Sequence, residues 1–221
     1  MLDPNVRLGV LFGEFVPRDG GLLRVQPKLR MVFMACSAQN VEPVLDFERE
    51  EELIADALSE FVSEGKVSLR VIEEGTLERL RARLMHDPYD VVHLTGHGVL
   101  TDEGPRLVME DALGGRKDVS AADLLEVFQD AREKPYLVVI SSCWSAGTRG
   151  DLPSLAARLV EGGVPSVIGW ARPVRDDVAT KAARNLYERL CVGESVMQAT
   201  AHARQRMHDD DMKRLLPSHA W

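Results

Sequence analysis

The sequence predicts an α/β fold in which about five or six mostly parallel strands form a central sheet flanked by helices. From residue 29 onward, apolar runs of strand length alternate with longer segments of helical period, which is typical of strand–helix–strand units. The strand candidates are mostly continuous apolar runs, which indicates strands covered on both faces. With 221 residues, of which 45% are hydrophobic, the chain can bury a sizeable core without disulfides.

The first half of the chain contains two strand–helix pairs. Residues 29–37 form a short, continuous apolar run, which is typical of a buried strand. In residues 67–75 apolar and polar side chains alternate, which predicts a strand with one face more exposed to solvent. Residues 47–65 are expected to form a helix because their apolar side chains recur at helical spacing, namely Leu53, Ile54, Ala57, Leu58, Phe61 and Val62. Thr76 is placed to cap a second helix over residues 77–87.

The second half continues the alternation. The expected buried strands are residues 89–98, 135–147 and 164–171, with a shorter strand-like segment at 106–111. Ser120, with Asp123 three positions on, is close to a capping box and opens a helix. Two more helical segments are expected at residues 152–163, with Pro153 in the first turn, and at residues 177–207, with a break near residues 192–193.

The opening segment differs from the rest of the chain. It is expected to form a β-hairpin that turns at residues 18–21, or to be the remnant of a linker. We therefore divide the chain into an N-terminal part, residues 1–28, and a main domain, residues 29–221.

Composition disfavours several classes of protein. The 27 Lys and Arg against 35 Asp and Glu give a net charge of −8 without a long basic cluster, which argues against a nucleic-acid surface. Cys36, Cys143 and Cys191 are too few and too far apart for a disulfide framework, so a reduced, cytoplasmic compartment is expected. Neither a signal peptide nor a membrane span is visible. The expected partner is a protein or a small molecule, not nucleic acid or a membrane.

Two of the predicted strands, consecutive among the buried ones, end in reactive side chains set between small residues. His97 lies between Gly96 and Gly98, and Cys143 follows two serines. Functional groups of parallel sheets collect beyond the carboxyl ends of the strands, so these two are expected to face one crevice. A histidine can activate a thiol as a base or as a positive partner. The backbone N–H groups of Gly98 and Cys143 can form an oxyanion hole, each donor contributing about 3 kcal/mol in the transition state.

Other histidines and cysteines have plainer interpretations. His93 is about 13 Å from His97 along an extended strand, too far to share a zinc ion, so no metal site is expected there. His93 is therefore interpreted as a structural residue. Cys36 ends the first strand near the same edge, where it lines the pocket or simply packs, and Cys191 is expected to be core.

The segments DVVHLTGHG and VVISSCWSAG resemble the His and Cys motifs of the CHAT domain, a family related to caspases, metacaspases and separase. Residues 29–54 resemble its first strand and acidic first helix, and residues 164–205 resemble its tail. The resemblance covers about residues 29–221.

This resemblance implies a caspase-like α/β sandwich and a cysteine endopeptidase that cleaves a protein substrate without metal or organic cofactor. It implies that His97 is the base and acid, that Cys143 is the nucleophile, and that the N–H groups of Gly98 and Cys143 form the oxyanion hole. It also implies control by fused or partner modules, such as tetratricopeptide repeats or sensors, as in regulated proteolysis or bacterial defence.

The acid that would select the substrate's P1 side chain is not where metacaspases place it. They carry an acid two positions before the cysteine, where this sequence has Ser141. Separase takes its acid from the loop after the next strand, where this chain has Asp176 and Asp177. Either would favour a basic P1 side chain, and stabilisation of the helix start is the alternative role. Thr95 and Cys36 are further candidates for lining the pocket.

Two features stay open in the sequence. The family usually continues past the last residues of this chain, so a final strand is expected to be missing. The loop at 147–153, with Arg149, is either a self-processing or gating segment or an ordinary surface turn.

The main alternative function is a catalytically silent caspase-like module that binds a partner protein. In that case the His–Cys pair is a relic. A flavodoxin-like ligand-binding or receiver domain is disfavoured, because the phosphate loop or clustered aspartates that it needs are missing.

Overall fold

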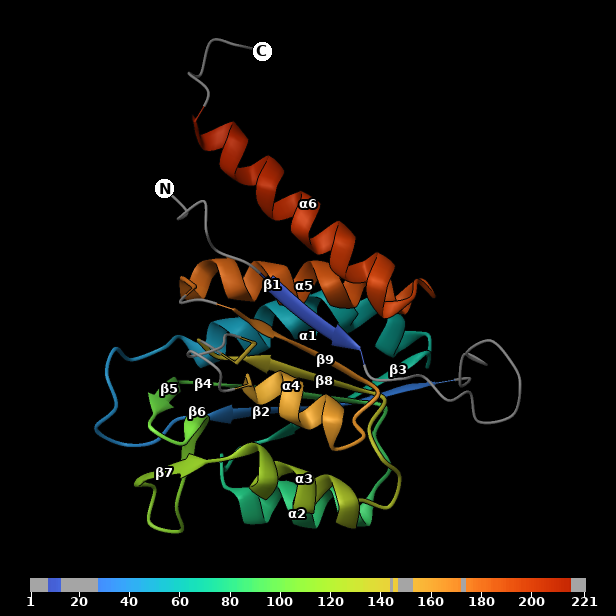
Figure 1. Cartoon of the computed structure of the whole chain (residues 1–221). Helices are drawn as coiled ribbons and strands as arrows, with labels where there is room; N and C mark the ends of the chain where they lie inside the picture. The colour runs from blue at the N-terminus through green and yellow to red at the C-terminus, as the bar shows by residue number, and fades with distance from the viewer. Residues whose placement is uncertain (1–7, 13–27, 144, 147–152, 172–173, 216–221) are drawn as a thin grey trace.

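The computed structural model describes residues 8–12, 28–143, 145–146, 153–171 and 174–215. Within these residues, a six-stranded sheet has the order β1-β9-β8-β4-β2-β3 and helices on both faces (Figure 1). The parallel strands are β2 (Leu29–Cys36), β3 (Val67–Ile72), β4 (Val91–Gly96), β8 (Leu137–Ser141) and β9 (Ser166–Trp170). The predicted α/β class with a mostly parallel sheet is confirmed.

The sheet ends at β9 with one antiparallel addition, β1 (Leu8–Phe12). This strand belongs to the segment expected to form an N-terminal hairpin, and in the described residues its partner is β9. The predicted turn at residues 18–21 lies outside the described residues.

Helices cover the sheet in two layers because each presents one apolar face. One layer contains α1 (Phe47–Ser63) and α5 (Asp176–Cys191), and α6 (Val196–Leu215) packs on the outer side of α5. The other layer contains α2 (Leu77–His86), α3 (Ala121–Asp130) and α4 (Leu155–Glu161) (Figure 1). The core is split accordingly, since alternate side chains of a strand point to opposite faces. On β4, Val92 and Leu94 pack toward α2, α3 and α4, whereas Val91 packs toward α1 and α5.

A second, antiparallel sheet follows β4 directly. Among the described residues it contains β5 (Gly98–Thr101), β6 (Gly104–Glu110) and β7 (Arg116–Val119) in that order. Only β6 corresponds to a strand predicted from the sequence. β5 and β7 have four residues each and are largely half-buried or exposed, so they lack the apolar run that marks a core strand.

The helix ends agree with the sequence where a side chain caps them. Ser120 and Asp123 form the complete capping box of α3, and Thr76 accepts a hydrogen bond from the backbone of Arg79 at the start of α2. The helix predicted from residue 152 instead begins at residue 155, because Ser154 is the N-cap and its hydroxyl accepts from the Ala157 N–H. Gly193, with φ 88°, separates α5 from α6 as expected.

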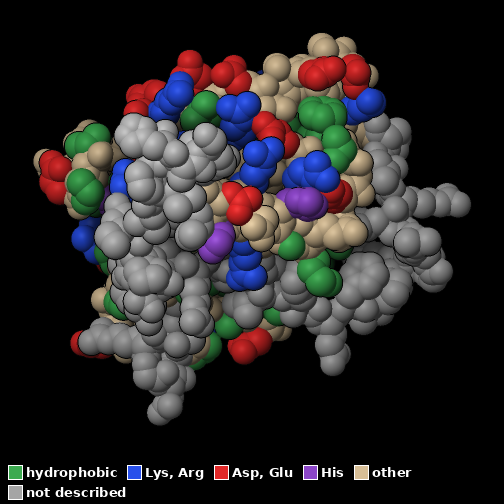
Figure 2. Space-filling view, turned by 90° about the horizontal axis from the view of Figure 1, so that it is seen from above, with side chains coloured by type: hydrophobic (Ala, Val, Ile, Leu, Met, Phe, Trp, Pro, Cys, Tyr) green, Lys and Arg blue, Asp and Glu red, His purple; other side chains and the backbone are tan. Residues whose placement is uncertain are grey.

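Acidic and basic side chains are interspersed on the face formed by α5 and α6. Figure 2 shows this face from above, with neither sign gathered into one patch among the described side chains.

None of the described helices is long and apolar enough to cross a membrane.

Candidate active site

The two predicted reactive residues follow neighbouring strands. β4 and β8 are parallel partners at the centre of the sheet, and their last paired residues are Thr95 and Ser141. His97 and Cys143 come two residues after this pair, one on each chain segment. The expectation that these strand ends lie side by side is confirmed.

Gly98 brings the two segments into backbone contact. A Cβ built on Gly98 would lie 1.8 Å from the carbonyl oxygen of Cys143, closer than any real contact. Only a residue without a side chain therefore fits beside Cys143 without moving the backbone. His97, the neighbour of Gly98, is half-buried, and so is Cys143.

The small sheet fixes the backbone at His97. The carbonyl oxygen of His97 accepts a hydrogen bond from the N–H of Val108 on β6, with an N···O distance of 2.8 Å. Gly98 begins β5 and pairs with Leu107 of β6. The histidine therefore lies at the junction of two sheets, which leaves its main chain little freedom.

Ser145 anchors the turn that contains Cys143. Its hydroxyl lies 3.0 Å and 2.8 Å from the carbonyl oxygens of Ile140 and Ser142, and accepts a 2.9 Å hydrogen bond from the N–H of Trp170. A Cβ on Gly169 would lie 2.4 Å from this hydroxyl oxygen, so β9 needs glycine there. We did not single out Ser145 from the sequence, although small residues after a strand-end cysteine are a usable signal.

A buried acid lies beneath both strand ends. Glu50 of α1 is 1% exposed. Its Oε2 accepts a 2.6 Å hydrogen bond from the Thr95 hydroxyl, and its Oε1 accepts a 3.0 Å bond from the Ser141 hydroxyl. His93 Nε2 lies 3.3 Å from Oε1, and His93 Nδ1 lies 2.7 Å from the Tyr187 hydroxyl.

These contacts decide the charge of Glu50. Burial by itself would raise the pKa of this carboxyl. The contact with His93 and the hydrogen bonds from Thr95 and Ser141 favour the carboxylate more strongly, so the pKa of Glu50 is lowered from its ordinary value. The ionised form of this carboxyl is therefore favoured at the strand ends.

Comparison with known families decides the relationship of the chain. Residues 22–221 match the CHAT domain. The chain belongs to the CHAT domain family. A search of curated proteins gave no match.

Solved structures place this CHAT domain among caspase-like folds. It superimposes on the crystal structure of the Arg-specific cysteine proteinase gingipain R with a TM-score of 0.57 and 13% identity, covering 84% of this chain and 44% of that one. The CHAT domain thus spans less than half of the gingipain chain. Pyridoxal kinase from Staphylococcus aureus, in complex with AMP-PCP and pyridoxal, gives a TM-score of 0.37 and 10% identity, covering 80% of this chain and 85% of that one.

The candidates for lining the substrate pocket of the CHAT domain lie in different surroundings. Thr95 and Ser141 are 2% and 9% exposed, and both hydroxyls are engaged by Glu50. Cys36 is buried in the core, where burial raises the pKa of its thiol well above the usual range. Packing, the second role considered for Cys36, is the one that its surroundings favour.

The two aspartates of the candidate pocket lie at the start of α5. This helix follows β9, which neighbours β8, so it begins at the same edge of the sheet as Cys143. Arg175 is the N-cap residue and makes no side-chain cap bond, so neither aspartate is the cap. Asp177 is exposed and pairs with Arg175 at 3.0 Å, and the side chain of Asp176 lies outside the described residues.

The remaining candidates are structural or undescribed. His93 stacks on Phe33 in the core, in agreement with its structural interpretation. Cys191 is partly buried against the same core, and burial raises the pKa of its thiol to about 12. Among the described residues, no group of three or more His, Cys, Asp or Glu side chains can hold a metal ion. Arg149 and residues 147–152 lie outside the described residues.

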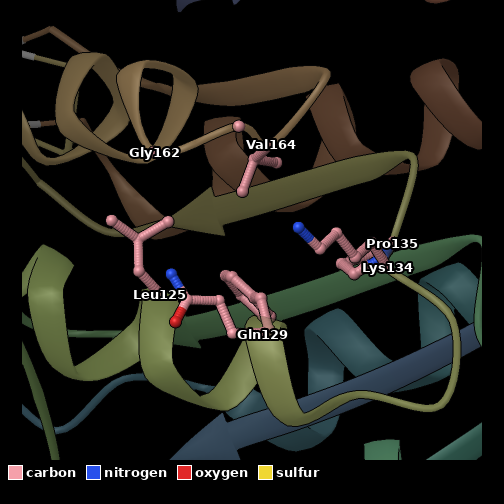
Figure 3. A pocket seen from close by; sticks show the side chains of 8 residues that line it. Leu125, Gln129, Lys134, Pro135, Gly162 and Val164 are labelled. Carbon is pink, nitrogen blue, oxygen red and sulfur yellow. The ribbon is translucent and has the colours of Figure 1, made fainter.

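A small cavity lies at the other end of the strands. It has a volume of about 10 Å³ and is lined by side chains that include Leu125, Lys134 and Val164 (Figure 3). Lys134 and Val164 precede β8 and β9, so the cavity is at the amino ends of the strands and is separate from His97 and Cys143. It has room for roughly one water molecule.

Proposed function

We propose that this CHAT domain is a cysteine endopeptidase in which His97 and Cys143 form the catalytic dyad. The observation that supports the proposal is the backbone contact of Gly98 with Cys143 at the ends of two parallel, adjacent strands. The family match and the caspase-like fold agree with this class of enzyme.

In the proposed mechanism, the thiolate of Cys143 attacks the scissile carbonyl carbon and forms a C–S bond. The negative charge passes to the carbonyl oxygen, where the N–H groups of Gly98 and Cys143 stabilise it. The His97 imidazolium gives its proton to the leaving amine as the C–N bond breaks. Water, deprotonated by His97, then hydrolyses the thioester and regenerates the thiolate.

A peptide library tests the dyad directly. Incubation of the wild-type chain with diverse peptides, followed by mass spectrometry of the products, is expected to reveal defined cut sites. Cys143→Ala and His97→Ala should each lower the cleavage rate by at least ~10³-fold, because each removes a reacting group. Cys191→Ala and His86→Ala, which alter residues away from both strand ends, should retain the wild-type rate.

The silent-module alternative predicts a different result. In that case the intact Cys143 does not react with a thiol-directed inhibitor, even with a partner protein present. Cleavage that persists in Cys143→Ala would also overturn the dyad.

The start of α5 supplies the proposed P1 specificity. We assign selection of a basic P1 side chain to Asp176 or Asp177, which lie at the edge of the sheet that bears Cys143. A charge-assisted hydrogen bond of this kind contributes about 1.5–3 kcal/mol. The description of gingipain R as Arg-specific is consistent with such a pocket in this fold.

Alanine variants measure this specificity. Asp176→Ala or Asp177→Ala should lower kcat/KM for peptides with Arg at P1 by about tenfold or more, and leave other peptides largely unchanged. Asp56→Ala, an exposed aspartate on α1, is the matched control. Equal loss on all peptides would remove the proposed role.

The proposal includes a reducing compartment and external control. Among the described residues Cys36, Cys143 and Cys191 are free thiols, which suits the cytoplasm. The natural protein substrate is then cleaved under the control of a fused or partner module.

A further inference from the structure

We propose that Glu50 is a positioning residue, whose carboxylate ties the ends of β4 and β8 together and so sets how His97 faces Cys143. The inference rests on the proposed function, because it concerns the same dyad. Glu50 lies on α1, far from both residues in sequence and outside both motifs.

The carboxylate spans two strands with its two oxygens. Oε2 accepts from Thr95 of β4 at 2.6 Å, and Oε1 accepts from Ser141 of β8 at 3.0 Å. Thr95 and Ser141 are direct partners in the β4–β8 register, and they are the last pair before the strands end. One rigid group therefore fixes the separation of the two strand ends.

The tied residues are placed symmetrically relative to the dyad. Thr95 precedes His97 by two residues, and Ser141 precedes Cys143 by two residues. A shift of either strand end would move one reacting side chain relative to the other, and reaction rates are sensitive to misplacements of about 1 Å. The hydrogen bonds of Glu50 to Thr95 and Ser141 are thus located where they control the geometry of His97 and Cys143.

Packing alone does not call for an acid at position 50. The buried side chains of α1 are Glu50, Ile54 and Leu58, which recur every four residues along one face. An apolar side chain at position 50 would continue this stripe without the desolvation penalty of a buried carboxylate. The ionised side chain is retained here together with a matched set of donors, which is the arrangement of a built polar network.

The cluster of buried polar groups continues through His93 to α5. His93 Nε2 lies 3.3 Å from Oε1, and the other ring nitrogen lies 2.7 Å from the hydroxyl of Tyr187. His93 and Tyr187 are both fully buried. Glu50 is therefore in contact with His93 of β4 as well as carried on α1, so its position is not set by α1 alone.

The hydroxyl partners allow the bridge to be cut without removing the buried acid. Thr95→Val keeps the shape of the side chain and removes one donor, and Ser141→Ala removes the other. Glu50→Gln keeps the size and removes the charge. Glu52→Gln is the matched control, because Glu52 lies on the same helix but is exposed and pairs with Arg49.

Two readouts distinguish positioning from a structural role. The first is the split between kcat and KM on a peptide cleaved by the wild-type chain. The second is the rate at which iodoacetamide alkylates Cys143 across pH 4–10, followed on the Cys143 peptide by mass spectrometry. Loss of stability alone lowers the melting temperature but leaves both readouts of the folded protein unchanged.

We expect Thr95→Val and Ser141→Ala each to lower kcat by about tenfold with KM nearly unchanged, since the substrate still binds but the dyad is misaligned. The pH midpoint of Cys143 alkylation should move upward, in the direction of the His97→Ala variant. The combined variant should lose less than the product of the two single losses, because both cut the same bridge.

The outcomes separate this inference from the proposed function. If His97→Ala leaves the alkylation profile of the wild-type chain unchanged, the dyad is wrong and the positioning role is overturned with it. If the dyad is intact but Thr95→Val and Ser141→Ala behave like Glu52→Gln, only the positioning role is overturned. These two variants decide the matter even where Glu50→Gln does not fold.

Discussion

The backbone of Gly98 lies against the backbone of Cys143, and this contact joins the segment that carries His97 to the segment that carries Cys143. The position that a Cβ would occupy on Gly98 is taken by the carbonyl oxygen of Cys143. In the sequence alone, a glycine beside His97 leaves the backbone free to bend sharply and lets a substrate carbonyl come close. The structure adds a second reason, which is that the backbone of the neighbouring segment already fills this space.

Gly98→Ala is therefore expected to damage both stability and activity. Overpacking against backbone costs about 1–3 kcal/mol of unfolding free energy, and the displaced Cys143 should lower peptide cleavage by more than about tenfold. Urea unfolding and the peptide assay measure the two effects.

A second glycine provides the control. Gly163 has open space around it but a φ of 98°, so Gly163→Ala adds strain at the opposite end of the sheet without touching the dyad. It should lose stability and keep its activity when folded. Wild-type activity in Gly98→Ala would contradict the close contact of the two segments.

Single residues were predicted unevenly. His97 and Cys143 are readable because each follows a continuous apolar run and is flanked by small residues. A functional role for Glu50 could not be predicted in this way. Acidic residues are ordinary at a helix start, and helix α1 has acids on its exposed side as well. Its signal was the spacing of four residues to Ile54, which places it on the buried stripe.

At the scale of the elements, predictions succeeded where the local pattern and the tertiary environment agree. The buried strands β2, β4, β8 and β9 are covered on both faces, so their apolar runs are long enough to recognise. β5 and β7 were missed because they are paired by backbone hydrogen bonds to β6 and bury little of their own. A short strand of this kind exists only because its partner is present.

The elements also explain why the site is rigid. β6 holds the carbonyl of His97, and Ser145 connects the Cys143 turn to the N–H of Trp170 on β9. The Ser145 carbonyl also accepts from the Ala156 N–H in α4. Each reactive segment is therefore fixed by an element other than the strand that it follows.

For the whole molecule, the buried acid predicts how stability varies with pH. The pKa of Glu50 is lower in the folded state than its ordinary value of 4.5, so the unfolded chain binds a proton more readily. The contribution of Glu50 is complete above about pH 4.5 and is lost as the pH falls through the folded-state value. Stability should therefore fall on acidification.

Glu50→Gln isolates this contribution. It should be less stable than the wild type at pH 7, by on the order of 1–3 kcal/mol, because buried donors lose their charged acceptor. The difference should shrink as the pH falls below about 4.5, as measured by urea unfolding at each pH. For Glu52→Gln, the unfolding free energy should depend on pH as it does in the wild type. If the curves of unfolding free energy against pH for Glu50→Gln and the wild type are parallel, the carboxyl of Glu50 is not stabilised as described.

The sequence by itself determined the fold class, the order of the main strands and helices, and the two candidate reacting residues. These features depend on hydrophobic periodicity and on which residues end a strand, and both are local in the chain. Only the tertiary structure decided that β4 and β8 are partners in register, that Gly98 lies against Cys143, and that Glu50 joins Thr95 to Ser141. The physical reason is that these contacts join segments about 45 to 91 residues apart, and their geometry is set by packing that no local pattern encodes.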